Sequence, residues 1–484
     1  MNFSSAKTDR ESTEASFVIV GNCIAAMVAA CELGNRGLNV TVVNPAPNWG
    51  GHFSSKNING HFFDLGMVGF EFTGFHKKPS RDVLLYDSRR RNDVARFCAL
   101  AQEYVEEIIP VHRAKPPAML WQEHVLPDVL MGNDLEVLRM MPADTQAAII
   151  SEVEAILSNP DRSRHASKKV DNPLYLSMSY EEASIANHGA TFHKLFIEPF
   201  ANKLFAGGAG RFSANYHRCL WMPLYYPETL LAAMGAQPHD ITTLFHYPAA
   251  GRIGALAEAL LQRLEQLPNV RILTSAITSI EGSGPFTLVL ADGSTLETSQ
   301  LAWGQDLANL LRLTRSGEPR LQQHKFEKTA ATFGFFAVDR RRLKRPFSSL
   351  FVIDPKYFVY RISNLSDAGG TSEDVARLVM ECSSHFFGDV PPKNARMVQQ
   401  ISQELVQFGL IEDESAILAE EAYTVPAIMP VPNRLDHELF WESHDLVRQL
   451  QPRLKLIGPA SGYLITTLND QVIQGIKVAR EVLI

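Results

Sequence analysis

The chain has 484 residues, of which 45% are hydrophobic and 20% are charged, a composition typical of a globular protein rather than a disordered one. Its length exceeds what one small core can organise, so two or three domains are expected. The formal net charge of −7 argues against nucleic acid as a partner, because phosphate binding needs a basic surface.

The cysteines and the N-terminal sequence favour a cytoplasmic protein. The five cysteines are widely spaced without a Cys-x-x-Cys pair, which indicates neither a disulfide framework nor a zinc site. The first sixteen residues are polar and lack the apolar core of a secretory signal. No apolar run approaches the roughly 20 residues that span a bilayer. We expect a cytoplasmic protein without a membrane span, with residues 1–16 as a disordered tail.

A strand, a tight turn, a helix and a second strand follow this tail. Residues 17–20 are an apolar run that ends at Gly21, and residues 24–33 have helical character. Residues 40–43 then form a β-branched run typical of a buried strand. The pattern predicts a right-handed βαβ unit with parallel strands, which is the start of a Rossmann-type domain.

The predicted secondary structure of the remaining chain changes several times. Residues 94–109 and 147–157 show helical spacing, whereas residues 246–300 return to alternating helix and strand. Residues 328–382 are rich in strand-forming residues. A last strand is predicted at 454–457 and is followed by a final helix. We expect this strand to join the sheet of the N-terminal strands, although it lies more than 400 positions away.

The first predicted strand-to-helix turn partly matches the dinucleotide fingerprint G-x-G-x-x-G/A. Glycines in that fingerprint let the backbone turn tightly, so that a pyrophosphate can approach the helix N-terminus. Gly21 and Ala26 fit the first and third positions, whereas Cys23 replaces the middle glycine. We expect the sulfur of Cys23 to lie where the pyrophosphate comes closest. A purely structural turn is the alternative.

Polar and glycine residues follow the second strand. Asn44 stands where an acidic residue normally binds the ribose hydroxyls, and an amide can also hydrogen-bond a hydroxyl. Gly50, Gly51 and His52 come next, and the segment GHFFDLG ends at Gly66. Paired glycines let a loop pass close under a phosphate or ribityl chain. The alternative is an ordinary surface loop.

The order of these motifs resembles the superfamily of FAD-dependent amine oxidases, protoporphyrinogen oxidases and UDP-galactopyranose mutases. The resembling segments are residues 60–66, 196–205, 247–254, 358–364, 423–426, 456–459 and 466–470. The resemblance implies an α/β fold with a glutathione reductase-like, Rossmann-type FAD-binding domain, a mixed-sheet substrate domain and a helical insertion. It implies an FAD-dependent oxidoreductase or mutase-like enzyme with a small-molecule substrate. The implied cofactor contacts are Gly21, Cys23, Ala26, Asn44, Gly50, Gly51, His52, Gly66, Gly458, Thr466 and Asn469.

Four aromatic or basic residues are candidates for substrate binding. Arg361 and Tyr360 lie in the segment that is similar to the mutase strand with a substrate-pyrophosphate arginine. Tyr423 lies in a later segment of the same resemblance, and Tyr225 belongs to a proline-flanked aromatic stretch. A cation–π surface position is the alternative for Arg361, and packing is the alternative for the tyrosines. No catalytic residue or metal-ligand cluster stands out.

The expected domain organisation assembles the FAD-binding domain from three separate segments. The division is a tail (1–16), a first FAD-binding segment (17–85), a helical substrate-binding insertion (86–245), a second FAD-binding segment (246–310), a substrate domain (311–452) and a C-terminal FAD-binding segment (453–484).

Two classes of function fit these observations. The first is a flavoenzyme with redox or isomerase chemistry on a small biosynthetic substrate, either a nucleotide sugar or an amine-, porphyrin- or polyketide-like compound. The second is a degenerate relative that acts as a non-catalytic accessory or scaffold protein. The replacements at Cys23 and Asn44 motivate the second class. The mutases' second arginine is replaced around Leu464, which disfavours mutase activity. A homodimer is compatible with the sequence.

Overall fold

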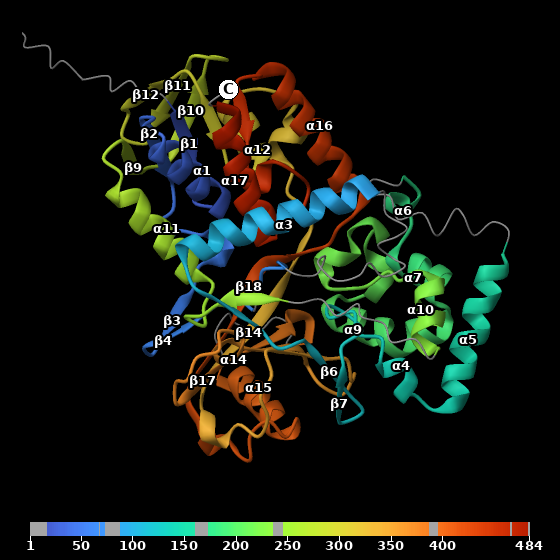
Figure 1. Cartoon of the computed structure of the whole chain (residues 1–484). Helices are drawn as coiled ribbons and strands as arrows, with labels where there is room; N and C mark the ends of the chain where they lie inside the picture. The colour runs from blue at the N-terminus through green and yellow to red at the C-terminus, as the bar shows by residue number, and fades with distance from the viewer. Residues whose placement is uncertain are drawn as a thin grey trace, which may run out of the picture.

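The computed structural model describes residues 17–66, 68–72, 88–159, 173–235, 245–386, 395–464 and 467–482. Figure 1 shows a Rossmann-type α/β region at the top, a second sheet below it and a group of helices at one side. Helix α3 (Ser88–Ile108) runs across the middle between them. Among the described residues no helix is both long and apolar enough to cross a membrane.

A five-stranded parallel sheet forms the centre of the Rossmann-type region. Its order is β19-β13-β1-β2-β9. The strands are β1 (Phe17–Val20), β2 (Val40–Asn44), β9 (Val270–Thr274), β13 (Leu301–Trp303) and β19 (Leu454–Leu456). The prediction that the last strand joins the first two in one sheet is confirmed. Segments from both ends of the chain therefore meet at the carboxyl edge of this sheet, where doubly wound folds bind their ligands.

Three helices pack on this sheet. Helix α1 (Ile24–Asn35) is almost entirely apolar and buried, because α11 (Gly254–Gln266) and α17 (Leu468–Val482) cover it. Gly475 permits the close approach of α17, since a Cβ there would lie 2.6 Å from the Cβ of Val28. The C-terminal helix is thus fixed against the helix that follows the first strand.

The second sheet has seven strands in the order β18-β14-β17-β16-β15-β6-β7. All its pairs are antiparallel except β15 with β6. The strands are β6 (Ala118–Trp121), β7 (His124–Pro127), β14 (Lys328–Asp339), β15 (Ser349–Val352), β16 (Val359–Asn364), β17 (Val375–Ser383) and β18 (Ile417–Pro430). The expected helical insertion 86–245 therefore also supplies two strands, β6 and β7, to this sheet. The division into domains itself stays a prediction.

One face of the seven-stranded sheet is covered by α15 (Ala395–Gln407) through Met397, Ile401 and Leu405, which lie in one apolar cluster. The opposite face looks toward the Rossmann-type region, where β3 (Lys56–Ile58) and β4 (His61–Phe63) form a hairpin. The second sheet thus has one face covered by α15 and one face that meets the Rossmann-type region.

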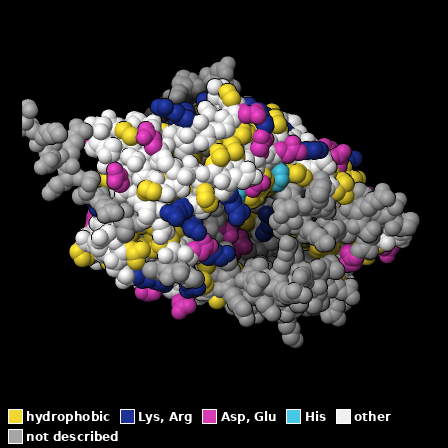
Figure 2. Space-filling view, turned by 90° about the horizontal axis from the view of Figure 1, so that it is seen from above, with side chains coloured by type: hydrophobic (Ala, Val, Ile, Leu, Met, Phe, Trp, Pro, Cys, Tyr) yellow, Lys and Arg dark blue, Asp and Glu magenta, His cyan; other side chains and the backbone are white. Residues whose placement is uncertain are grey.

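Further elements complete the chain. The remaining α-helices are α4 (Val137–Met140), α5 (Ala143–Ser158), α6 (Pro173–Ser177), α7 (Tyr180–His188), α8 (Ala190–Phe192), α9 (Glu198–Leu204), α10 (Pro227–Met234), α12 (Leu307–Leu313), α13 (Pro319–Gln323), α14 (Leu365–Ala368) and α16 (Arg434–Leu450). The remaining strands are β5 (Val111–Arg113), β8 (His246–Pro248), β10 (Ile277–Glu281), β11 (Phe286–Leu290) and β12 (Thr295–Thr298). On the face shown in Figure 2, basic, acidic and apolar side chains are interspersed.

Candidate functional site

The first strand-to-helix turn has the geometry of an anion-binding turn. Gly21 has a φ of +133°, and its amide donates to the carbonyl of Val43. Helix α1 begins after Cys23, which makes no side-chain cap, and the first turn carries no acidic residue. The Ala25 amide in this first turn donates to Gln471 Oε1 of α17 at 3.4 Å, and no N-cap side chain takes the other amides. The helix dipole favours an anion at this start.

The glycine loop runs past this helix start. Gly50 and Gly51 have φ values of +86° and +60°, and the Gly50 amide donates to the Asn22 carbonyl at 2.8 Å. The Asn22 side chain in turn donates to the carbonyl of Asn48. The nearest atom to a Cβ added at Gly51 would be Asn22 Oδ1, 4.0 Å away. The loop therefore leaves room beside the start of α1. His52 follows with an exposed side chain.

The side chain of Asn44 makes hydrogen bonds within the loop that follows β2. Its Nδ2 donates to the Asn48 carbonyl at 3.2 Å, and its Oδ1 accepts from the Ala46 amide at 3.0 Å. Only 1% of the residue is exposed. Asn44 thus fixes the loop against β2. Its expected role toward a ribose stays a prediction.

The sulfur of Cys23 points toward two glycines that follow other strands, Gly304 after β13 and Gly458 after β19. A Cβ at Gly458 would lie 2.6 Å from Sγ, and one at Gly304 would lie 3.2 Å from it. The thiol therefore fills the gap between the ends of β1, β13 and β19, which the glycines make wide enough. Burial raises the pKa of the Cys23 thiol to about 11, so the group is uncharged at neutral pH. An uncharged thiol does not repel a bound anion.

Asp64 joins two motifs that are far apart in sequence. Its carboxylate accepts hydrogen bonds from the Ser55 hydroxyl at 2.5 Å, from the Tyr247 hydroxyl and from the Ile253 amide at 2.7 Å. Burial raises the pKa of Asp64, while these donors act in the opposite direction. The segments GHFFDLG and YPAAGRIG are therefore one structural unit, which the sequence did not reveal. The nearby Arg377 also donates to carbonyls of both segments.

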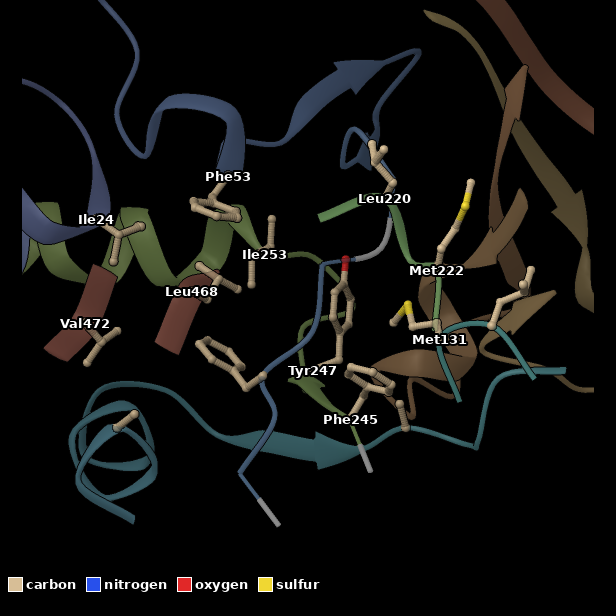
Figure 3. Close-up of a cluster of buried hydrophobic side chains, with 14 of the residues drawn as sticks. Ile24, Phe53, Met131, Leu220, Met222, Phe245, Tyr247, Ile253, Leu468 and Val472 are labelled. Atoms are coloured by element: carbon tan, nitrogen blue, oxygen red, sulfur yellow. The ribbon is translucent and has the colours of Figure 1, made fainter. Parts of the chain in front are cut away.

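An apolar layer lies beside this unit. Figure 3 shows Phe53, Ile253 and Leu468 grouped close to Ile24, with Tyr247 toward the middle of the view. Phe53 follows the glycine pair, Ile253 precedes α11, and Ile24 and Leu468 begin α1 and α17. Tyr247 lies in β8, and all five side chains are buried. The layer joins the N-terminal and C-terminal halves of the candidate nucleotide site through contacts that exclude water.

Four side chains occupy one row across the inner face of the seven-stranded sheet. Arg361 pairs with Glu381, Glu381 with Phe333, and Phe333 with Tyr423, on strands β16, β17, β14 and β18. Cross-strand partners point to the same side of a sheet. The structure thus brings together Arg361 and Tyr423, two residues that the sequence singled out 62 positions apart.

A buried ion pair stands at the end of this row. Arg361 Nε lies 2.6 Å from Glu381 Oε1, and the Tyr360 hydroxyl donates to Glu381 Oε2 at 3.3 Å. An irregularity in the pairing of β16 at Tyr360 lets consecutive residues reach the same carboxylate. Trp221 covers the guanidinium, with Arg361 Cζ 4.2 Å from its ring centroid. Arg361 is 2% exposed, so it is neither a surface residue nor open to solvent.

Gly66 connects the ion pair to the GHFFDLG segment. It has a φ of +80°, and a Cβ there would lie 2.5 Å from both Arg361 Nη2 and Glu381 Oε1. The segment GHFFDLG therefore rests directly on the charged end of the row. Only glycine satisfies both the backbone angle and the spacing.

The remaining predicted site residues make fewer polar contacts than Arg361 or Asp64. Tyr423 stacks on Phe335 at 5.1 Å, and Lys56 Nζ lies 3.6 Å from the Tyr423 ring centroid. Tyr225 donates to the Val129 carbonyl at 2.6 Å and is buried within the helical group, an arrangement typical of packing. Asn469 donates to the Glu71 carbonyl at 3.1 Å. Ala26 is buried inside α1, and Thr466 lies outside the described residues.

Comparisons with known proteins agree with this geometry. A family model described as an NAD(P)-binding Rossmann-like domain matches residues 19–84. A reduced UDP-galactopyranose mutase superposes with a TM-score of 0.71 and 16% identity over 97% of this chain and 95% of that chain. A protein named as a protoporphyrinogen oxidase from Exiguobacterium sp. 255-15 superposes with a TM-score of 0.65 and 16% identity, over 97% of this chain and 99% of that chain. No curated protein sequence matches.

The chain shares the fold of these proteins, a Rossmann-type α/β region joined to a mixed sheet. A putrescine oxidase bound to putrescine also superposes on this chain, with a TM-score of 0.62 and 12% identity over 97% of this chain and 99% of that chain. The fold class expected from the sequence is thereby confirmed. At these identities the likeness concerns the fold, so the function rests on the residues of this chain.

The contact between Gly66 and the ion pair can be tested by a matched pair of substitutions. Gly66→Ala is expected to lower the midpoint of thermal unfolding by several degrees, because the new Cβ meets buried charged atoms. Gly60→Ala is the control, since Gly60 has a φ of +86° with nothing within 4 Å of an added Cβ. Equal losses in the two variants would show that backbone strain alone acts and that the contact is unimportant.

Proposed function

We propose that the chain is an FAD-dependent enzyme that acts on a small-molecule substrate. The observation that carries the proposal is the start of α1, which has no N-cap side chain and lies beside the open space at Gly51. The C-terminal segment at Gly458 packs against Cys23 on another side of this start. These features suit a dinucleotide pyrophosphate, which needs backbone donors and a close approach of the chain. The uncharged thiol of Cys23 is turned toward Gly304 and Gly458 and is compatible with such a ligand.

The residues that would hold FAD come from three segments. The backbone amides at the start of α1 and at Gly51 would bind the pyrophosphate, and Asn44 would face the adenosine ribose. The N-terminus of α17, which includes Asn469, would direct the positive end of the helix dipole toward the flavin end of the cofactor. When bound, FAD supplies the redox or nucleophilic chemistry, while the protein supplies orientation.

The substrate side of the site is the row from Arg361 to Tyr423. The ion pair with Glu381 and the ring of Trp221 hold Arg361 in place, so that its charge supports the loop at Gly66. Phe333 and Tyr423 give the same row an aromatic end, and Tyr423 is only half-buried. We propose that the substrate body lies at this aromatic end, as most small-molecule sites are lined by apolar and aromatic side chains.

Flavin content is the direct test of cofactor binding. The purified full-length protein is expected to be yellow and to release FAD on denaturation. Gly51→Leu is expected to lose the flavin, because its side chain would enter the space beside α1. Gly409→Leu is the control, since Gly409 has a matching φ of +62° and open space in the turn after α15. A folded, colourless wild type that takes up no FAD would refute the proposal and favour the accessory-protein alternative.

The buried state of Arg361 leads to a prediction about the substrate. A nucleotide-sugar pyrophosphate would have to compete with Glu381 for a guanidinium that is 2% exposed, and separating a buried pair costs about 3–5 kcal/mol. We therefore expect the reduced protein not to interconvert UDP-galactopyranose and UDP-galactofuranose, as followed by chromatography of the sugar nucleotides. Turnover on the order of 1 per second or faster would contradict this prediction.

A further inference from the structure

A lysine from the Rossmann-type region lies over the aromatic end of the row on the second sheet. It is Lys56, the first residue of β3, and its Nζ is 3.6 Å from the centroid of the Tyr423 ring. We propose that Lys56 determines specificity, so that the site accepts an apolar substrate whose polar end is an oxygen acceptor, such as a carboxylate, and rejects an amine. The inference rests on the proposed position of the substrate beside Tyr423.

Packed aromatic rings fix the position of this lysine. Phe335 stacks on Tyr423, and Phe63 of β4 meets Phe335 edge to face, with the centroids of these two rings 5.6 Å apart. Because β3 pairs with β4, the contact of Phe63 also holds the strand that carries Lys56 against the second sheet. The ammonium group is therefore placed over Tyr423 by packing between the two regions of the fold.

A carboxylate of the second sheet holds the same ammonium group. Lys56 Nζ donates to Glu421 Oε1 at 3.3 Å. Glu421 and Tyr423 are two positions apart on β18, so their side chains point to the same face of the sheet. An aromatic ring and a carboxylate are the groups that bind a cation most favourably, and here both contact a cation of the protein itself.

This arrangement disfavours a positively charged substrate. A second ammonium group beside Tyr423 would meet the like charge of Lys56, and a built-in repulsion of this kind is a source of specificity. An oxygen acceptor meets the opposite situation, because an ammonium has three donors and no acceptor. The side chain of Lys56 is 40% exposed, so an entering molecule can reach it. The aromatic end therefore suits an apolar body that carries a carbonyl or carboxylate oxygen.

The test is calorimetric titration of the full-length protein at neutral pH with phenylpropionate and phenylpropylamine, which have similar shapes and opposite charges. The wild type is expected to bind the carboxylate saturably and about tenfold or more tightly than the amine, as one charged contact implies. Lys56→Met should weaken carboxylate binding and strengthen amine binding, because it removes the positive charge beside Tyr423. Lys56→Arg should keep the wild-type order, because it keeps the charge.

Lys356→Met is the matched control. Lys356 also lies over a tyrosine ring, with Nζ 4.8 Å from the centroid of Tyr357, and it also pairs with a glutamate, Glu123 at 2.7 Å. Lys356 belongs to the loop between β15 and β16, and Glu123 to the turn between β6 and β7. Both lie outside the row that contains Tyr423, so the control should bind the two compounds as the wild type does.

Four results would overturn the inference. They are no saturable binding of phenylpropionate to a folded wild type, tighter binding of the amine than of the carboxylate, unchanged affinities in Lys56→Met, and equal changes in the control. Calorimetry does not require bound flavin, and the flavin content of the same samples tests the proposed function separately. A colourless wild type with the expected preference would refute the cofactor proposal and support the role of Lys56.

Discussion

The parallel pairing of β19 with β13 is the constraint on which the rest of the structure depends. It places Gly458 beside Cys23 and aligns α17 along α1, although more than 400 positions separate Cys23 from Gly458. Without this pairing, the start of α1 would face solvent on the side that the C-terminal segment now closes. The candidate nucleotide site is therefore a product of long-range strand pairing, and no single local motif contains it.

Two buried carboxylates extend this arrangement to the second sheet. Asp64 holds the GHFFDLG segment to the start of α11, and Glu381 holds Arg361 under Gly66. Both groups are buried and satisfied by several donors, which is how a protein keeps a charge away from water without a large cost. The end of the GHFFDLG segment is consequently held twice, by the hydrogen bonds of Asp64 and by the packing of Gly66 on the ion pair.

The sequence predicted the elements better than their contacts. Residues 17–20, 24–33 and 40–43 form the expected strand, helix and strand, because apolar periodicity and turn residues act locally. The position of strand 454–457 followed from the fold that the motif order resembles. The partner of Arg361 was missed, because Glu381 becomes its neighbour only through the pairing of β16 with β17. The sulfur of Cys23 was expected beside a pyrophosphate, whereas the glycines that follow β13 and β19 receive it.

Hydrogen exchange of the full-length protein, with and without bound FAD, tests the two-ended site most directly. The account predicts that FAD slows exchange of the amides at the start of α1 and at Gly51, and also of those at the start of α17, while α15 is unchanged. The N-terminal and C-terminal segments should respond at the same FAD concentration, because one ligand contacts both. Protection confined to one end of the chain, or no protection at either, would contradict the account.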